Sequence, residues 1–371
     1  MVSSPMTLRA FLAPHVAALR EKYAVTVVAN LGNGTLMSVD TEDDGIVSIP
    51  IERRIAPLRD LAALAGLVRL FRQARFAAVQ SVTPKAGLLS MLAGWFTRVP
   101  VRIHIFTGQV WATRRGLARW LLKMVDRLIA GCATHVLVDS PTQRDFLLAE
   151  GVIGADKSRV LDRGSISGVD TARFKPDPEV RTDMRRQLGY GDGDVVFMYL
   201  GRVNRDKGML DLAAAFARVA AASANLRLLA VGPDEDDIRN LMLAALGNAA
   251  ARAKFIDFTD RPQDYLAAAD VFCLPSYREG FGTVVIEAAA CGVPAIASRI
   301  YGLTDAVVDG VTGTLHAPGD IDALTAAMTR LAADPQLRRM LGEAARQRAL
   351  ADFPAAALTS ALLGFYAKIL N

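Results

Sequence analysis

The chain contains few of the residues on which covalent cross-links and histidine-based metal centres depend. Its 371 residues include three cysteines and four histidines. These are Cys132, Cys273 and Cys291, and His15, His104, His135 and His316. An odd number of scattered cysteines favours reduced thiols over a disulfide framework, and histidines this far apart have no zinc-type spacing. We therefore expect no disulfide framework and no metal site built on histidine. A bound cofactor is not expected either.

Long uncharged apolar runs are missing as well, although 52% of the residues are hydrophobic and the mean hydropathy is +0.25. The most apolar candidate, Leu117 to Val138, is interrupted by charged residues, namely Arg119, Lys123, Asp126 and Arg127. A bilayer-spanning helix needs about 20 predominantly apolar residues, so we do not expect this segment to span. The N-terminal residues show no basic region followed by an apolar core, so we expect no secretion signal and a cytoplasmic protein.

Positive charge concentrates in the first half of the chain. Residues 1–172 carry 21 Lys/Arg against 14 Asp/Glu, whereas the remainder carries 22 against 24. Between Lys85 and Arg127, eight basic residues accompany a single acid, Asp126. A basic and apolar surface suits an anionic membrane or a phosphorylated lipid; a merely solvated basic face is the alternative. Because the basic residues are not interleaved with aromatics as in RNA-binding motifs, nucleic acid is not an expected partner.

Short apolar segments alternate with Ala/Leu-rich helical segments along the whole chain. Continuous hydrophobicity in the short segments predicts buried parallel strands covered by helices. The expected strands are Val25–Asn30, Ala77–Val82, Val101–Phe106, His135–Asp139, Val195–Leu200, Leu226–Val231, Lys254–Phe258, Val271–Leu274 and Pro294–Ser298. A linker with a helix over Pro178 to Leu188 separates the two halves. We predict an α/β protein of two doubly wound domains, residues 1–172 and 173–350, with a ligand cleft between them.

The start of the first domain departs from this plan. A doubly wound domain normally opens with a full apolar strand, but only Met1 to Ser4 precede Pro5. The free-energy cost of losing a central strand would exceed the net stability of about 5–15 kcal/mol that is typical of a domain. We therefore expect a truncated first strand with a compromised first domain, or a true start upstream.

The segment from Pro275 to Glu287 carries the clearest chemical signal. An apolar strand leads into a loop with Gly280 and Gly282, and a helix is expected to open near Thr283. Backbone amides freed by the glycines, together with the positive end of the helix dipole, make an anion site. Glu287 is the only charged residue from Thr283 to Val293, so its carboxylate is expected to be buried and to need hydroxyl donors.

A second segment, Tyr199 to Gly208, follows the first strand of the second domain. Arg202 and Lys207 lie on one loop and can reach the same diphosphate from two sides, the first as a planar fork and the second as a mobile point charge. The triplet Asp234-Glu235-Asp236 resembles a metal-binding acidic motif, but it follows Val231-Gly232-Pro233. We interpret it as a solvated helix start.

These segments, with others, carry a family resemblance. The matching residues are Gly201-Arg202, Lys207-Gly208, Glu279 to Pro294, Gly310-Val311-Thr312-Gly313 and Gly168-Val169-Asp170. In these segments the chain resembles the retaining GT-B glycosyltransferases of the family 4 type, which include capsule, exopolysaccharide and lipid-linked oligosaccharide enzymes. The resemblance covers nearly all of the second half and is looser in the first. It also implies that the C-terminal helix, residues 351–371, crosses back to the first domain.

The resemblance implies a role for each residue of the two loops. Arg202 and Lys207 would hold the donor diphosphate and, with Glu279 on the transferred sugar, form the catalytic set. Glu287 would take the ribose hydroxyls. The remaining donor-binding residues, which would offer backbone amides, are Gly201, Gly280, Phe281, Gly282 and Thr283. Transfer from a nucleoside-diphosphate sugar would retain the anomeric configuration and need no metal.

The first domain would bind the acceptor, a polyprenyl-diphosphate sugar anchored in the membrane, at the inner face of the plasma membrane. The segment from Phe106 to Trp111 resembles a stretch found in bacterial enzymes that extend undecaprenyl-diphosphate-linked sugars. Relatives often have a His-Gly pair, whose histidine contacts the donor sugar, where this chain has Thr107-Gly108. The role of that histidine is therefore unassigned here, and His104 has a catalytic, a structural or an acceptor-side place. Arg114 and Arg115 are expected near the acceptor diphosphate.

Two other functions remain open at this level. Nucleotide-sugar 2-epimerases share the architecture, although they use clustered acids and histidines, and histidine is scarce here. A catalytically impaired nucleotide-sugar-binding subunit is the other alternative, because the first strand is short.

Overall fold

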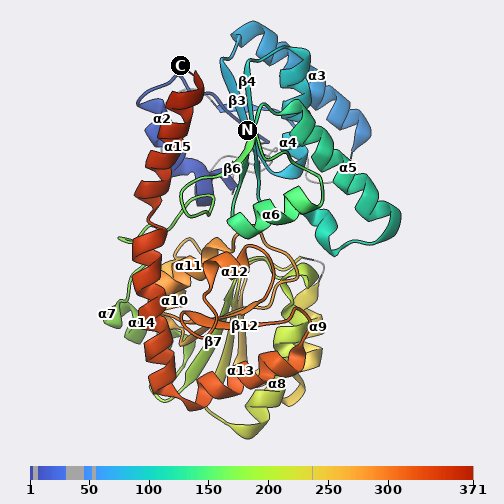
Figure 1. The fold of residues 1–371 in the computed structure, drawn as a ribbon. Helices are drawn as coiled ribbons and strands as arrows, with labels where there is room; N and C mark the ends of the chain where they lie inside the picture. Colours follow the sequence, from blue (N-terminus) through green and yellow to red (C-terminus); the bar gives the residue numbers. More distant parts are fainter. Residues whose placement is uncertain (3–6, 31–45, 52–55, 236, 371) are drawn as a thin grey trace. The chain divides into compact units, whose positions relative to one another are not determined.

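The computed structural model describes residues 1–2, 7–30, 46–51, 56–235 and 237–370. The chain forms two compact units. One comprises Met1–Ser167 with Ala356–Asn371, and the other comprises Gly168–Ala355. Both are α/β units with parallel strands (Figure 1).

The second unit is built on a six-stranded parallel sheet with the order β12-β11-β10-β7-β8-β9. Its strands are β7 (Val195–Leu200), β8 (Leu226–Val231), β9 (Ala253–Ile256), β10 (Val271–Leu274), β11 (Ala295–Ser298) and β12 (Gly313–His316). The chain runs outward from β7 in one direction and from β10 in the other, so the strand order reverses between these two neighbours. In open α/β sheets, ligands bind outside the carboxyl ends of the strands at such a reversal.

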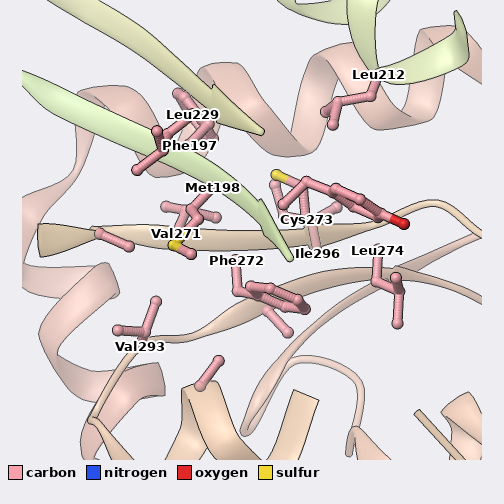
Figure 2. Close-up of a cluster of buried hydrophobic side chains, with 14 of the residues drawn as sticks. Phe197, Met198, Leu212, Leu229, Val271, Phe272, Cys273, Leu274, Val293 and Ile296 are labelled. Carbon is pink, nitrogen blue, oxygen red and sulfur yellow. The ribbon is translucent and has the colours of Figure 1, made fainter. Parts of the chain in front are cut away.

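Helices cover both faces of this sheet. They are α7 (Pro178–Leu188), α8 (Met209–Ala222), α9 (Ile238–Leu246), α10 (Pro262–Ala268), α11 (Thr283–Ala290), α12 (Leu303–Ala306), α13 (Ile321–Ala333) and α14 (Pro335–Asp352). Helix α8 packs between α9 and α13, while α11 packs on α14 and α10 on α7. Side chains of β7 and β10, among them Phe197, Met198 and Phe272, fill the core between the layers (Figure 2). Strands β7, β10 and β11 are buried almost throughout their length, which is why they appear in the sequence as apolar runs.

The first unit has a four-stranded parallel sheet, β3-β4-β5-β6, and a parallel pair, β1-β2. The strands are β1 (Val27–Ala29), β2 (Ile46–Ser48), β3 (Ala78–Val82), β4 (Val101–Phe106), β5 (His135–Val138) and β6 (Ser158–Val160). Its helices are α2 (Ala13–Arg20), α3 (Pro57–Ala74), α4 (Pro84–Phe96), α5 (Gly116–Cys132), α6 (Pro141–Ala149) and α15 (Ala355–Leu370), with a π-helical turn at Leu8–Leu12. The short, partly polar strands β2, β6 and β12 were not predicted, because their apolar runs are too brief to stand out.

The N-terminal residues join the two sheets of the first unit. The Met1 amine donates to the Gln80 carbonyl at 2.7 Å, and the Met1 carbonyl accepts from the Val82 amide at 3.0 Å. On the other side, the Val2 amide donates to the Val28 carbonyl at 3.0 Å. Met1 and Val2 therefore occupy the place of a central strand between β3 and β1. Ser3 and Ser4, the rest of the expected strand, lie outside the described residues.

The boundary between the units lies between residues 167 and 168, not at 172 as expected. Val169 is the reason, because its amide donates to the Phe353 carbonyl at 2.8 Å and its carbonyl accepts from the Ala355 amide at 2.9 Å. These bonds tie the linker to the second unit. At Ala355 the chain begins α15, whose Tyr366 hydroxyl donates to the Gln80 side chain of the first unit at 2.8 Å.

None of the helices in the described part of the chain is both long enough and apolar enough to cross a membrane.

Candidate functional site

Two loops meet at the carboxyl edge of the second unit's sheet, where the strand order reverses. The loop after β7 carries Arg202 and Lys207, and the loop after β10 carries Glu279. The Tyr277 amide donates to the Asp206 carbonyl at 2.8 Å, and the Arg278 guanidinium donates to the Asp206 carboxylate at 2.8 Å. These contacts hold the two loops together and fix the relative positions of their charged side chains.

Lys207 and Glu279 form the centre of this arrangement. The Lys207 ammonium donates to Oε1 of Glu279 as an ion pair, and the Ser276 hydroxyl donates to the same oxygen at 2.9 Å. Both charged side chains are mostly shielded from solvent, with 20% and 12% of their surface exposed. Asn204 positions the lysine, since its side-chain oxygen accepts from the Lys207 amide at 3.1 Å. The structure therefore places a cation and a carboxylate side by side at the ligand-binding edge.

Arg202 is held by a residue that the sequence did not single out as functional. Its guanidinium donates to both carboxylate oxygens of Glu235, at 3.1 and 2.8 Å, and Asn204 donates to the same carboxylate at 3.0 Å. Buried Tyr199 supports the loop, because its hydroxyl donates to the Arg202 carbonyl at 2.6 Å. Asp234, the first acid of the triplet, accepts from the first amides of α9 at 2.9 and 3.1 Å. The helix-start interpretation holds for Asp234, whereas Glu235 positions Arg202 and Asp236 lies outside the described residues.

Glycines shape the backbone around this edge. Gly282 is the N-cap of α11, has φ +80°, and contributes no side-chain cap to the first helical turn. The helix end thus presents amides and the positive end of its dipole, as an anion site requires. Phe281 is 2% exposed and packs edge-on against Phe353 with ring centroids 5.1 Å apart. Its ring therefore belongs to the core, and only its backbone is available for a ligand.

Glu287 lies within α11 and is not a member of the Lys207–Glu279 ion pair. Burial raises the pKa of its carboxyl to about 7, against a smaller lowering by the Arg173 guanidinium. Within the described residues, this carboxyl has no hydrogen-bond or ion-pair partner. A half-buried acid in that state is ready to accept hydroxyl donors from a ligand.

The raised pKa of Glu287 predicts a pH-dependent stability. The folded protein holds this proton up to about pH 7, whereas the unfolded chain releases it near 4.5. At low pH the carboxyl is protonated in both states and does not lower the free energy of unfolding. As pH rises through this window, the free energy of unfolding falls by on the order of 3 kcal/mol. Glu287→Gln should remove this loss, so the variant should gain stability relative to the wild type between about pH 5 and about pH 8. Urea unfolding at both pH values measures the difference, and parallel pH profiles for the two proteins would contradict it.

His104 does not lie on an acceptor-binding surface, which corrects that part of the sequence interpretation. It is 1% exposed, its Nδ1 is 2.9 Å from the Ser81 hydroxyl, and its ring contacts Phe106 edge-on at 4.6 Å. Gly87 of α4 leaves the room that the ring fills, because a Cβ there would overlap the imidazole. Burial lowers the pKa of His104 to about 3. The imidazole is therefore a neutral core side chain.

The remaining acceptor-side candidates follow β4 in the first unit. Thr107 and Gly108 are partly buried, and Gly108 has φ +117°. Arg114 and Arg115 are exposed and come directly before α5. Among the described residues, no three His, Cys, Asp or Glu side chains gather in a way that could hold a metal ion.

Comparison with protein families matches each half of the chain. Residues 180–348 match the family described as glycosyl transferases group 1. Residues 9–164 match the glycosyl transferase 4-like domain. A capsular polysaccharide biosynthesis glycosyltransferase, CapM from Staphylococcus aureus, is 30% identical over 87% of this chain and 85% of its own length.

Solved structures show the same fold. Sucrose-phosphate synthase from Thermosynechococcus elongatus superposes with a TM-score of 0.79 and 25% identity, over 99% of this chain and 94% of that one. Anabaena HepE in complex with UDP-glucose superposes with a TM-score of 0.74 and 21% identity, over 87% of this chain and 86% of that one.

Proposed function

Because the chain belongs to the group 1 glycosyltransferases of the family 4 type and has the GT-B fold, we propose that it transfers a hexose or N-acetylhexosamine from a nucleoside-diphosphate sugar, UDP- or GDP-linked, to a lipid-linked or polysaccharide acceptor. The HepE structure, solved with UDP-glucose, supports a donor of this class.

The observation that carries the proposal is the set of charges at the strand-order reversal. Arg202 and Lys207 come from the loop after β7, and the loop after β10 brings Glu279 into contact with the lysine. A diphosphate at this edge would receive two cations and the amides at the start of α11. A sugar attached to it would meet the Glu279 carboxylate. Lys207 and Ser276 both contact Oε1 of this group, so its second oxygen can accept a hydrogen bond from a sugar hydroxyl.

The same residues account for the chemistry. Cleavage of the anomeric C–O bond leaves negative charge on the nucleoside diphosphate, and fixed cations and amides stabilise that charge as it develops. The donor-side oxygen that leaves the sugar would take the proton of the acceptor hydroxyl on the same face, so the configuration is retained. In this scheme Arg202 and Lys207 supply the positive charge for which other transferases use a metal.

For the acceptor, we propose a membrane-anchored polyprenyl-diphosphate sugar, used at the inner face of the plasma membrane. CapM, a capsule-synthesis enzyme by name, covers most of this chain and supports a surface-polysaccharide role. The exposed Arg114 and Arg115 of the first unit supply positive charge for a lipid diphosphate.

A donor screen followed by product analysis tests the proposal. UDP- or GDP-sugars should raise the melting temperature, and the matching donor should extend polyprenyl-diphosphate sugars by one residue, as seen by mass spectrometry. An epimerised free nucleotide sugar without any acceptor would instead indicate an isomerase. Binding without turnover on all acceptors would indicate a non-catalytic subunit.

A further inference from the structure

Helix α5 presents a stripe of large apolar side chains to solvent. Leu117, Trp120, Leu121, Met124 and Leu128 are between 38% and 70% exposed. Their spacing places them on one side of the helix, because residues three and four apart share a face. The opposite side, with Asp126, Ile129 and Ala130, is buried in the first unit. The helix therefore has two apolar faces, one packed in the core and one turned to solvent.

The neighbouring helix α4 also exposes large apolar side chains. It packs against α5 (Figure 1), and its last turn exposes Trp95 and Phe96 at 55% and 54%. Soluble proteins rarely leave this many large side chains, two tryptophans included, in contact with water on adjacent helices. Exposed apolar side chains of this kind mark a site that a membrane or another protein covers.

The charges around the stripe are positive. Arg114 and Arg115 precede the helix, are exposed, and have no acidic partner in the described part of the chain. The single acid of α5, Asp126, points inward, where its carboxylate accepts from the Trp111 indole at 2.7 Å. Arg119 and Lys123 lie over the buried Trp111 ring, away from the stripe, and are paired with Glu150 at 2.7 and 2.6 Å. The outward face of α5 is thus apolar in its middle, basic at its N-terminal end and free of acids along the helix.

We propose that α5 lies in the interface of an anionic bilayer, with the stripe among the acyl chains and Arg114 and Arg115 on lipid phosphates. Tryptophans favour the boundary between headgroups and acyl chains, where one side of the ring is apolar and the other is wet. A second copy of the chain is a poorer occupant. In a stripe-to-stripe contact, the facing helix would offer no acid to Arg114 and Arg115, because Asp126 points inward.

This inference extends the proposed membrane location, yet its test involves neither donor nor acceptor. Co-sedimentation is measured with vesicles of phosphatidylcholine alone and of phosphatidylcholine with phosphatidylglycerol. We expect binding to the anionic vesicles, a blue shift of tryptophan emission, and loss of that shift in Trp120→Phe. The combined variant Leu117→Ser, Trp120→Ser, Leu121→Ser should bind at least about tenfold more weakly. Arg114→Gln with Arg115→Gln should weaken binding to anionic vesicles by about fivefold per charge.

A matched control uses three exposed apolar residues of the second unit. Leu241→Ser, Leu243→Ser and Met340→Ser remove side chains that are 42%, 36% and 59% exposed and should leave vesicle binding unchanged. Retained melting temperature and donor-induced stabilisation show that the stripe variant is folded. Equal vesicle binding by wild type and stripe variant overturns the proposal. The proposal is also overturned if the wild type sediments as a dimer and the stripe variant as a monomer, since the stripe would then be a contact between copies. Neither result affects the donor screen.

Discussion

Replacing Lys207 by alanine is expected to lower kcat/KM for sugar transfer by about 10²- to 10³-fold, the range found when one fixed group that stabilises developing charge is removed. In the folded chain this ammonium is held by the Glu279 carboxylate and by the capped turn at Asn204. It is therefore positioned before any ligand arrives and needs little reorganisation during bond cleavage. Steady-state kinetics with the donor identified in the screen measures the effect.

The loss of the ion pair has to be separated from the loss of catalysis. Lys207→Ala leaves a mostly shielded carboxylate whose one remaining donor among the described residues is Ser276. This should destabilise the second unit by about 1–3 kcal/mol. Adding Glu279→Gln to this variant should recover part of the stability and none of the activity. Arg218→Ala, which breaks the exposed pair with Asp322, is the control and should change neither quantity measurably. Recovery of activity in the double variant would show that Lys207 serves only to neutralise Glu279.

Gly208→Ala should produce the largest loss of stability among the substitutions considered. Gly208 has φ +69° and lies against the Pro275 carbonyl oxygen, so a Cβ would overlap an atom of the backbone. The two loops of the candidate site would have to separate. We expect a cost of about 3–5 kcal/mol, the range of changes that combine strain with a core clash, and loss of donor-induced stabilisation.

A second glycine isolates the effect of backbone strain alone. Gly189, which ends α7, has φ +68° and ψ +32°, close to the +69° and +25° of Gly208. The nearest atom to a Cβ there is the Lys254 ammonium nitrogen, 3.9 Å away. Gly189→Ala should therefore cost only the strain of a left-handed alanine, about 1–2 kcal/mol, and should keep donor binding. Equal melting temperatures for the two variants would mean that the loops are not held in contact at Gly208.

Much of the second unit could be predicted from local sequence. The runs Val195–Leu200, Leu226–Val231 and Val271–Leu274 are strands with the predicted bounds, because strands buried on both faces need uninterrupted apolar residues. The loops that follow β7 and β10 carry the charges that sequence analysis selected. The pairing of Arg202 with Glu235 was missed, since the two residues lie on loops from different strands and only sheet order makes those loops neighbours.

The amino-acid sequence alone determined the alternation of strand and helix, the parallel sheets, and the two loops that carry Arg202, Lys207 and Glu279. Those properties depend on local composition and spacing, which the sequence displays directly. The tertiary structure decided that His104 is a core residue, that Lys207 already contacts Glu279, and that α5 turns a second apolar face to solvent. Periodicity shows which residues share a face, but what covers that face depends on segments far away in the chain.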